Sequence, residues 1–417
     1  MENYNQNEIT AVIAIGGRGT RLKSITKDIP KPLFPIDRIS PLRRICKQVK
    51  EYGIREVFLT LGYGSEMFEE EIKKINLQFN LKIRTFKEEI PLGECGALWQ
   101  IKKFLNKQVL FINGDIVFAI DLNRFIGFHK RINSRLTLLT HTTTHPEDSD
   151  LISAPNGTLI KKLILKTEKN HQRSTAYLGN AGITLFDSDL LNIVPAPKLN
   201  ENSSLLSHFV FKAYSEKILI YSYNTSEYIK DMGTKKRFFQ VENDLKKGII
   251  DEKCYRNLQR ALFIDRDNTL IKCDHNSYVI GTEGLKFINY NIDKIAKISK
   301  DFHMVCLVTN QPQISMGILT IEKLDQINSL VVKNCLNHNL KIDIISFCPH
   351  HPHSGFNNEI DILKTDCFCR KPNPGMLIEL SYTRNINLKE SLFIGDSKRD
   401  EQAAKNAGCN FLNVDNL

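Results

Sequence analysis

The sequence predicts an α/β protein of two domains, and three observations support this prediction. At 417 residues the chain is longer than one hydrophobic core comfortably supports, which favours two folding units. Short β-branched runs alternate with amphipathic stretches of helix length, beginning with "TAVIAI", "PLRRICKQVKEYG" and "EVFLTLGY". After a highly charged stretch, the alternation resumes with "ALFID" at Ala261. Such alternation indicates repeated βαβ units, and therefore mostly parallel sheets.

The charged stretch "VENDLKKGIIDEKCYRNLQR", residues 241–260, has the composition of a helical junction. We therefore expect a first domain over residues 1–243, a linker over 244–259 and a second domain over 260–417.

The composition favours a globular protein that binds anionic ligands. Hydrophobic residues make up 41% of the chain and charged residues 25%, which is ordinary for a soluble domain. The formal charge of +10 comes from 57 basic and 47 acidic residues spread along the chain, and it suits phosphorylated ligands. Basic runs interleaved with aromatic residues are absent from the sequence, so we expect no nucleic-acid partner.

The sequence also predicts a cytoplasmic protein without a membrane partner. Its start, "MENYNQNEIT", is polar and acidic, unlike a secretory signal, and no apolar stretch is long enough to cross a bilayer. Three of the ten cysteines fall in one cluster and seven are scattered without a pairing pattern, which favours reduced thiols.

The first strand is followed by a glycine-rich loop with features of a phosphate site. "GGRGTRL" spans Gly16 to Leu22, and "PKP" follows at Pro30 to Pro32. Glycines let backbone amides approach phosphate oxygens, and Arg21 and Lys31 are two cations that can screen a triphosphate during attack. The spacing matches neither the Walker pattern nor G-x-G-x-x-G.

On these residues the first half resembles the sugar-phosphate nucleotidyltransferases, whose signature is G-G-x-G-T-R-L followed by P-K-P. The resemblance continues through "PLGECGAL" at residues 91–98, "NGD" at 113–115, "NAGI" at 180–183 and "KDMGT" at 230–234. It implies a Rossmann-like domain with a mixed, mostly parallel sheet, which joins a sugar 1-phosphate to a nucleotide with release of pyrophosphate.

The resemblance also implies roles for individual residues. Arg21 and Lys31 would act in catalysis, and Asp115 and Asp231 would bind Mg²⁺. Residues that would contact the nucleotide or the sugar phosphate are Gly16, Gly17, Gly19, Thr20, Gly93, Gly96, Asn180, Gly182 and Lys166, with Lys169 as the alternative to Lys166. Read without the family, Asp115 is a turn residue and Asp231 a helix cap.

Polar side chains also follow the strands of the second half. "FIDRDNTL" places Asp265 and Asp267 just past a strand, where one carboxylate can attack a phosphoryl group while the other handles the leaving-group proton. Thr309, Asn310 and Gln311 follow "MVCLV"; Lys371 and Asp396 come later.

This set resembles the haloacid dehalogenase superfamily phosphatases, which implies a haloacid dehalogenase-like Rossmannoid domain. By that likeness Asp265 is the nucleophile and Asp267 the general acid and base. Thr309, Asn310, Arg370 and Lys371 would bind substrate or its phosphoryl group, and Asp265, Asp267 and Asp396 would form a Mg²⁺ site, with Asp400 accessory. Two positions depart from the family: Asn268 replaces a usual Gly, and Met316 replaces a usual Arg, so phosphatase efficiency is in question.

"CPHHPHSGFNNEIDILKTDCFCRKPNPG" contains a candidate zinc site. The C-x-H and C-x-C spacing suits tetrahedral, structural Zn²⁺, while His351 and His353 leave the histidine ligand open; unligated cysteines are the alternative. The pattern resembles the zinc loops of histidinol phosphatases and, more closely, of heptose 1,7-bisphosphate 7-phosphatases. This likeness selects Cys348, His350, Cys367 and Cys369, and pinning the loop would deliver Arg370 and Lys371 to the substrate.

The whole chain thus resembles a fusion of both enzymes for activated-heptose synthesis. The expected substrates are a phosphorylated heptose and a nucleoside triphosphate, with GTP and the α-anomer favoured and other bases open. A hexose 1-phosphate nucleotidyltransferase joined to a histidinol-phosphate-type phosphatase is one alternative, and a phosphometabolite-binding protein with an inactive second domain is another. The sequence does not indicate the oligomeric state.

Overall fold

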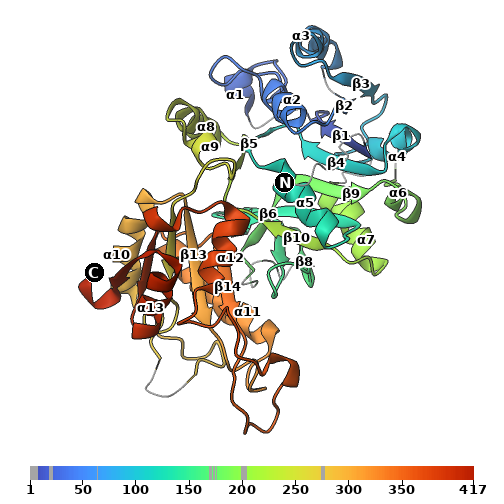
Figure 1. Ribbon diagram of the computed structural model, residues 1–417. Coiled ribbons are helices and arrows are strands. Elements are labelled where there is room, and N and C mark those ends of the chain that lie inside the picture. The colour runs from blue at the N-terminus through green and yellow to red at the C-terminus, as the bar shows by residue number, and fades with distance from the viewer. Residues whose placement is uncertain are drawn as a thin grey trace. The chain divides into compact units, whose positions relative to one another are not determined.

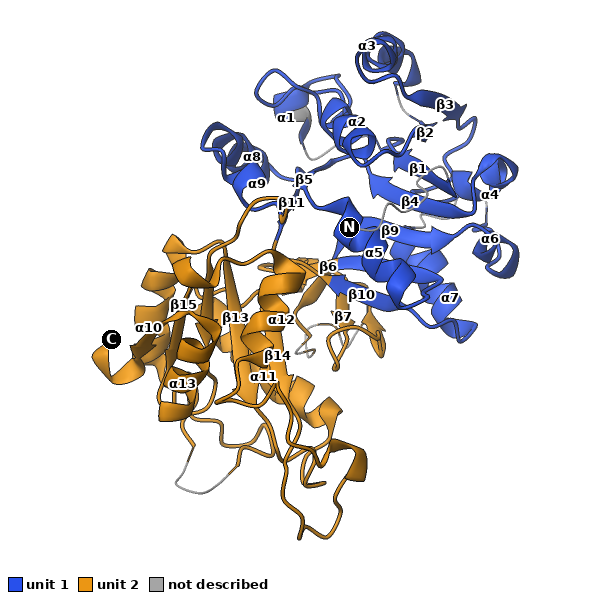
Figure 2. Ribbon diagram, in the orientation of Figure 1, with its two compact units in different colours: residues 1–139, 180–223, 227–254 blue, residues 140–179, 224–226, 255–417 orange. Residues whose placement is uncertain are grey.

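The computed structural model describes residues 8–17, 22–62, 64–168, 171, 174, 176–198, 204–273 and 278–417. Contacts divide the chain into two compact units, coloured separately in Figure 2. Unit 1 holds residues 1–139, 180–223 and 227–254; unit 2 holds 140–179, 224–226 and 255–417. Unit 2 therefore includes two stretches from the N-terminal half. The domain boundaries at 243 and 260 stay a prediction.

The larger sheet is mixed, with a parallel centre, as predicted. Strands β1 (Ile9–Ala14), β2 (Glu56–Leu61), β3 (Lys82–Lys87) and β4 (Gln108–Asn113) pair in parallel in the order β4-β1-β2-β3. β9 (Leu178–Asp187) pairs antiparallel with β4, and β6 (Leu136–Thr142) and β10 (Tyr221–Asn224) extend the sheet beyond it. β7 (Leu151–Ser153) and β8 (Lys162–Ile164) form an antiparallel side branch on β9.

Local sequence explains the elements around this sheet. β1 is buried along nearly its whole length, because helices cover both faces of a parallel sheet. In α2 (Pro41–Glu51) the Ser40 side chain accepts a hydrogen bond from the Arg43 amide, and Pro41 occupies the first turn. The other helices of the N-terminal half are α1 (Lys23–Thr26), α3 (Glu69–Phe79), α4 (Ala97–Ile101), α5 (Leu122–Arg131), α6 (Leu190–Ile193), α7 (Phe211–Ser215), α8 (Lys235–Lys246) and α9 (Ile249–Glu252).

The C-terminal sheet is parallel throughout its described strands. Its order is β14-β13-β12-β15-β16, formed by β12 (Ala261–Ile264), β13 (Met304–Asn310), β14 (Ile344–Cys348), β15 (Leu392–Gly395) and β16 (Asn410–Asn413). The helices that accompany it are α10 (Asn289–Ile298), α11 (Ile321–Asn337), α12 (Gly375–Arg384) and α13 (Lys398–Ala407), all labelled in Figure 1.

Alternation along β12 builds a core on each face of this sheet. Ala261 and Phe263 pack with Met376 and Leu377 of α12, whereas Leu262 packs with side chains of α10 and α11. This period of two is the pattern that predicts the strand. The three-layer arrangement fixes the carboxyl ends of the strands at one edge, where ligands bind in open α/β sheets.

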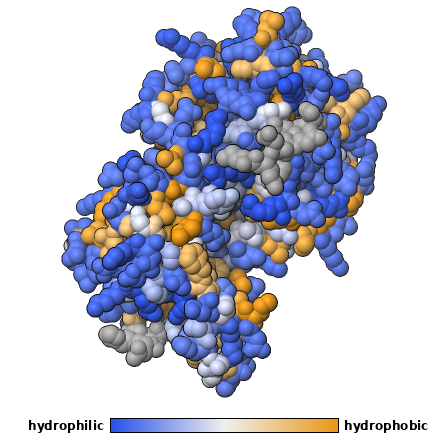
Figure 3. Space-filling view, viewed as in Figure 1, coloured by the Kyte–Doolittle hydropathy of each residue, from blue (hydrophilic) through white to orange (hydrophobic). Residues whose placement is uncertain are grey.

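The face seen in Figure 3 is mostly hydrophilic, with apolar residues in scattered groups. Among the residues that the structure describes, no helix is both long enough and apolar enough to cross a bilayer.

Candidate active sites

Four charged side chains meet at the carboxyl edge of the C-terminal sheet. Asp265 follows β12, Asp396 follows β15, and Asp400 lies in the first turn of α13. The Lys371 ammonium lies 2.5 Å from Asp265 Oδ1 and 2.6 Å from Asp400 Oδ1, and it also donates to the Val308 carbonyl at 3.0 Å. The structure therefore brings together the predicted nucleophile, the predicted lysine and the predicted metal ligand Asp396.

The electrostatics of this cluster follow from burial. Burial raises the pKa of Asp265 to about 7, Lys371 opposes this effect, and Asp400 and Asp267 add to it. Burial would lower the pKa of Lys371, but Asp265 and Asp400 outweigh it and the net shift is upward. Lys371 is thus a fixed cation, suited to a site that must attract a phosphoryl group beside a carboxylate.

Three carboxylates in this cluster fit a divalent cation. One oxygen each from Asp265, Asp396 and Asp400 lies within 4.8 Å of the other two. An all-oxygen, anionic set is the donor chemistry that Mg²⁺ prefers. The carboxylate of Asp267, also predicted as a ligand, is outside this group, and it accepts hydrogen bonds from Arg266 and Gln311.

Asn310, the last residue of β13, binds the backbone of Lys371. The Asn310 side chain accepts from the Lys371 amide and donates to the Lys371 carbonyl, each at 3.0 Å. Thr309 is buried, and its hydroxyl accepts a hydrogen bond from Gln311 at 2.8 Å. Asn310 therefore holds the backbone of Lys371, while Thr309 stays a predicted phosphoryl ligand.

Both departures from the phosphatase pattern have a local explanation. Asn268 adopts a φ of 59°, a left-handed conformation that Asn tolerates better than most residues, and its side chain accepts from the Cys273 amide at 2.9 Å. The turn that usually needs Gly is thus formed. Met316 is buried, so an apolar side chain closes this part of the loop. The question of phosphatase efficiency stays open to experiment.

The four predicted zinc ligands also lie together. Cys369 Sγ lies 3.2 Å from Cys367 Sγ, 3.3 Å from Cys348 Sγ and 3.2 Å from His350 Nδ1. Hydrogen bonds with Cys348, Cys367 and His350 lower the pKa of Cys369 to about 5, whereas the hydrogen bond with Cys369 raises the pKa of Cys348 and burial raises that of Cys367, so Cys369 is the first of the three thiols to ionise. His350, not His351 or His353, completes this group, which can hold a metal ion.

This cluster reaches the phosphatase site through the next residues. The Arg370 guanidinium donates to the His350 carbonyl at 3.2 Å, and the Asn373 side-chain Nδ2 donates to the Cys367 carbonyl at 3.0 Å. Lys371 follows two residues after Cys369. A metal in the cluster would therefore fix the position from which Lys371 extends.

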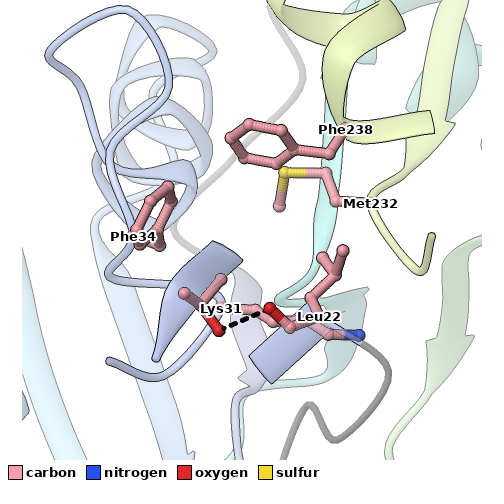
Figure 4. A pocket seen from close by; sticks show the side chains of 6 residues that line it. Leu22, Lys31, Phe34, Met232 and Phe238 are labelled. Carbon is pink, nitrogen blue, oxygen red and sulfur yellow. Dashed lines mark hydrogen bonds between the residues drawn. The ribbon is translucent and has the colours of Figure 1, made fainter. Parts of the chain in front are cut away.

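In the N-terminal half, part of the predicted phosphate loop is described. Gly16 and Gly17 follow β1, whereas Gly19, Thr20 and Arg21 lie outside the described residues. Lys31 is buried, and its ammonium lies 3.6 Å from Asp115 Oδ2. It lines a small pocket with Leu22, Phe34, Met232 and Phe238, and the aromatic and thioether side chains in Figure 4 form its apolar wall.

The two carboxylate residues predicted to bind Mg²⁺ are neighbours. β5 (Ile116–Ala119) pairs antiparallel with β11 (Tyr228–Asp231), which sets Asp231 opposite Ile116, and the Met232 amide donates to the Asp115 carbonyl at 3.1 Å. Asp231 accepts from Arg237 Nη1 at 2.8 Å and from the Gly233 amide at 2.7 Å. It does not cap α8, because Thr234 does so.

The remaining predicted residues differ in their surroundings. A Cβ on Gly96 would lie 2.3 Å from the Leu92 carbonyl, and Gly182 has a φ of 76° beside Asn113, so both positions require glycine. Asn180 accepts from the Gly182 amide, and Gly93 has a positive φ. Lys166 lies in unit 2 with an exposed side chain, and Lys169 lies outside the described residues.

One functional candidate was missed from the sequence. Glu88 directly follows β3 at the same edge as Gly16; a Cβ on Gly16 would lie 3.7 Å from Glu88 Oε2. That oxygen accepts from the Leu92 amide at 3.2 Å, and burial raises the pKa of Glu88. In "FKEEI" the residue looks like one of a run of surface charges, so only the fold reveals it.

Comparisons with known proteins agree with this geometry. The family model for nucleotidyl transferases matches residues 10–248, and that for haloacid dehalogenase-like hydrolases matches residues 352–414. The chain belongs to both families: it has a nucleotidyltransferase part and a phosphatase part. A Bacillus anthracis structure, a putative glucose-1-phosphate thymidylyltransferase, has the fold of the first part, with a TM-score of 0.50, 20% identity and coverage of 57% of this chain and 94% of that one.

Two curated relatives match one part each. D-glycero-alpha-D-manno-heptose 1-phosphate guanylyltransferase of Campylobacter jejuni is 34% identical over 186 residues, covering 44% of this chain and 77% of the relative. D-glycero-beta-D-manno-heptose-1,7-bisphosphate 7-phosphatase of Photorhabdus laumondii is 35% identical over 144 residues, covering 34% of this chain and 73% of the relative.

Proposed function

We propose that this chain is a two-step enzyme of activated-heptose synthesis. Its phosphatase part removes the 7-phosphate of D-glycero-D-manno-heptose 1,7-bisphosphate, and its nucleotidyltransferase part transfers GMP from GTP to the resulting 1-phosphate. The observation that carries the proposal is that the relatives of the two parts are named for a D-glycero-D-manno-heptose 1,7-bisphosphate and a D-glycero-D-manno-heptose 1-phosphate, which differ by the 7-phosphate and in the anomer named. The Asp265, Lys371 and Asp400 cluster supports the first step.

In the phosphatase step, Asp265 Oδ attacks phosphorus and the bond to the sugar oxygen breaks, while Asp267 gives that oxygen a proton. Water then attacks the aspartyl-phosphate, Asp267 takes its proton, and the bond from Asp265 to phosphorus breaks to release phosphate. Lys371 and Thr309 hold the phosphoryl oxygens, and Arg370 contacts the substrate. When bound by Asp265, Asp396 and Asp400, Mg²⁺ supplies positive charge for the phosphoryl oxygens.

In the transferase step, an oxygen of the sugar 1-phosphate attacks the α-phosphorus of GTP, and pyrophosphate leaves. Lys31 and Arg21 neutralise the phosphate chain beside Gly16 and Gly17, and Asp115 and Asp231 would hold a second Mg²⁺. Gly93, Gly96, Asn180, Gly182 and either Lys166 or Lys169 would complete the nucleotide and sugar contacts.

Glu88 supports the choice of guanine. Its backbone follows β3, but its Oε2 would lie only 3.7 Å from a Cβ on Gly16, so a base that packs near Gly16, with its phosphates farther along the glycine loop, can meet this carboxylate. Guanine presents two adjacent donors, N1–H and N2–H, which a carboxylate can accept together. The other bases offer a single donor or a donor beside an acceptor.

Removal of the 7-phosphate does not alter the configuration at C1, so both steps must use one anomer. The guanylyltransferase relative is named for the alpha anomer and the phosphatase relative for the beta anomer. We propose that the anomer specificity of the transferase part determines which bisphosphate the chain uses, and that this substrate is the α-anomer.

The Cys348, His350, Cys367 and Cys369 group would hold structural Zn²⁺, because three thiolates and one imidazole match its preferred donors. All ten cysteines are free of disulfides, which supports a cytoplasmic location.

Incubation of the full chain with each heptose bisphosphate anomer, Mg²⁺ and each of the four triphosphates tests the proposal. We expect phosphate release from the α-anomer. Of the four triphosphates, only GTP should then give pyrophosphate release. Phosphate release from histidinol phosphate, with none from either heptose, would support the alternative fusion, and turnover of neither substrate would support a binding protein.

A further inference from the structure

Arg266, which separates the two aspartates of the phosphatase loop, is a fully buried charge. Its side chain has 0% exposed surface, and it is the largest of the fully buried side chains among the described residues. An arginine cannot lose its charge in a protein, so such burial requires strong partners. Four hydrogen bonds supply them, and two of these go to Asp267.

The two bonds to Asp267 form a side-on pair. Arg266 Nε donates to Asp267 Oδ1 at 2.9 Å, and Nη2 donates to Oδ2 at 3.1 Å. A guanidinium that binds both oxygens of a carboxylate fixes the plane of the carboxylate as well as its position. The Asp267 side chain is 28% exposed, so the buried Arg266 binds it on the protein side while part of it remains accessible to solvent.

The guanidinium is itself anchored from two directions. Arg266 Nη1 donates to Asn328 Oδ1 on α11 at 3.0 Å, and Nη2 donates to Gln311 Oε1 at 2.9 Å. Gln311 Nε2 in turn donates to Asp267 Oδ2 at 3.1 Å and to Thr309 Oγ1 at 2.8 Å. The network therefore joins the predicted general acid to a predicted phosphoryl ligand through groups that solvent does not reach.

We propose that Arg266 is a positioning residue, which directs the Asp267 carboxyl group toward the leaving oxygen of the phosphorylated sugar. It acts through Asp267 and does not contact substrate. This inference rests on the phosphatase activity proposed above. Because proton transfer depends steeply on donor geometry, loss of the guanidinium leaves Asp267 in place in the sequence but without a defined direction.

A choice of leaving group separates positioning from general damage. A sugar alkoxide needs a proton in order to leave, whereas p-nitrophenolate leaves from p-nitrophenyl phosphate at neutral pH without one. In the full chain, we expect Arg266→Lys to lower kcat for heptose 1,7-bisphosphate by ~10- to 100-fold, a part of the roughly 10²- to 10⁴-fold that general-acid catalysis contributes, with KM changed less than about threefold. With p-nitrophenyl phosphate, release of the first equivalent of p-nitrophenolate, which precedes the hydrolysis step that also uses Asp267, should slow less than about threefold.

Two references make the result decisive. Asp267→Asn defines the full loss of the acid, and in that background Arg266→Lys should cause no further loss in kcat for the sugar substrate. Far-UV circular dichroism and the unfolding midpoint of the phosphatase part show whether the variant has folded, because transferase activity does not report on that part. If Arg266→Lys fails to fold, Gln311→Glu, which keeps the acceptor for Arg266 and removes the donor to Asp267, should give the same leaving-group dependence.

Equal losses in the first-turnover release of the sugar and of p-nitrophenolate, or additive losses in the double variant, would overturn the inference. Full activity of Arg266→Lys beside an inactive Asp267→Asn would refute the role of Arg266 alone. Full activity of Asp267→Asn would instead refute the proposed phosphatase roles.

Discussion

Replacement of Lys371 by methionine should remove the positive charge that balances the carboxylates of the phosphatase cluster. The ammonium is 4% exposed and is shared by Asp265 and Asp400, so Lys371→Met leaves two buried carboxylates without their cation. Asp400 keeps its hydrogen bonds from the Ser397 amide and hydroxyl at the start of α13. Asp265, whose pKa burial already raises to about 7, should therefore take up the proton and cease to be a nucleophile.

Breaking a buried ion pair costs about 3–5 kcal/mol. With a urea m-value of about 2 kcal/mol per M, the unfolding midpoint of the phosphatase part should fall by ~2 M. Trp99, the only tryptophan, lies in unit 1, so its fluorescence reports that unit while far-UV circular dichroism reports both. We expect a lower midpoint by circular dichroism, an unchanged fluorescence transition and loss of phosphate release by ~10²-fold or more.

Lys389→Met removes an exposed lysine and serves as the matched control. The double variant Lys371→Met/Asp400→Asn should regain stability without regaining activity, because one of the two competing charges is gone. Unchanged stability of Lys371→Met, or a simultaneous fall in both transitions, would refute the reasoning.

Three further predictions follow from individual groups. Glu88→Gln should lower kcat/KM for GTP by ~10- to 100-fold while values for UTP change less than about threefold; equal losses with both would argue against base recognition. Burial lowers the pKa of His129 to about 4. Between pH 6.5 and 4 this imidazole is therefore protonated in the unfolded state and neutral in the folded state, so the free energy of unfolding falls as the pH falls through this range. His129 should contribute about 2 kcal/mol to the loss by pH 5 in urea unfolding followed by Trp99 fluorescence, and His129→Gln should remove that share; an unchanged pH dependence in this variant would contradict the assignment. Cys367→Ser should release zinc, measured by elemental analysis, and reduce phosphate release, whereas Cys409→Ala should retain both; full zinc content in Cys367→Ser would exclude this cysteine as a ligand.

The parts of the site that lie at strand ends can be predicted from the sequence. Parallel strands place their carboxyl ends at one edge, so a motif after β12 and another after β15 must meet there. This is why Asp265 and Asp396 are expected together, and they do lie together. The zinc ligands are equally accessible from the sequence, because two close pairs of soft ligands have the spacing of a tetrahedral metal site.

The partners of buried charges cannot be predicted in this way. Arg266 between two aspartates looks like part of a solvated turn, and only the approach of Gln311 and Asn328 from distant elements explains its burial. Contacts between distant residues also explain why unit 2 combines residues 140–179 and 224–226 with residues 255–417. Thr142, for example, donates to the Asp343 carbonyl at 3.2 Å, a contact between residues far apart in the sequence that no local pattern encodes.

The central claim is that one chain removes a phosphate from a heptose bisphosphate and then activates the product. The most direct test is a time course of the full chain with D-glycero-α-D-manno-heptose 1,7-bisphosphate, GTP and Mg²⁺, in which phosphate and pyrophosphate are measured together. The account predicts that phosphate appears first and that pyrophosphate follows to the same final amount. Asp265→Asn should abolish both, and added heptose 1-phosphate should restore pyrophosphate release alone. Pyrophosphate release without prior phosphate release, or phosphate release that survives in Asp265→Asn, would contradict it.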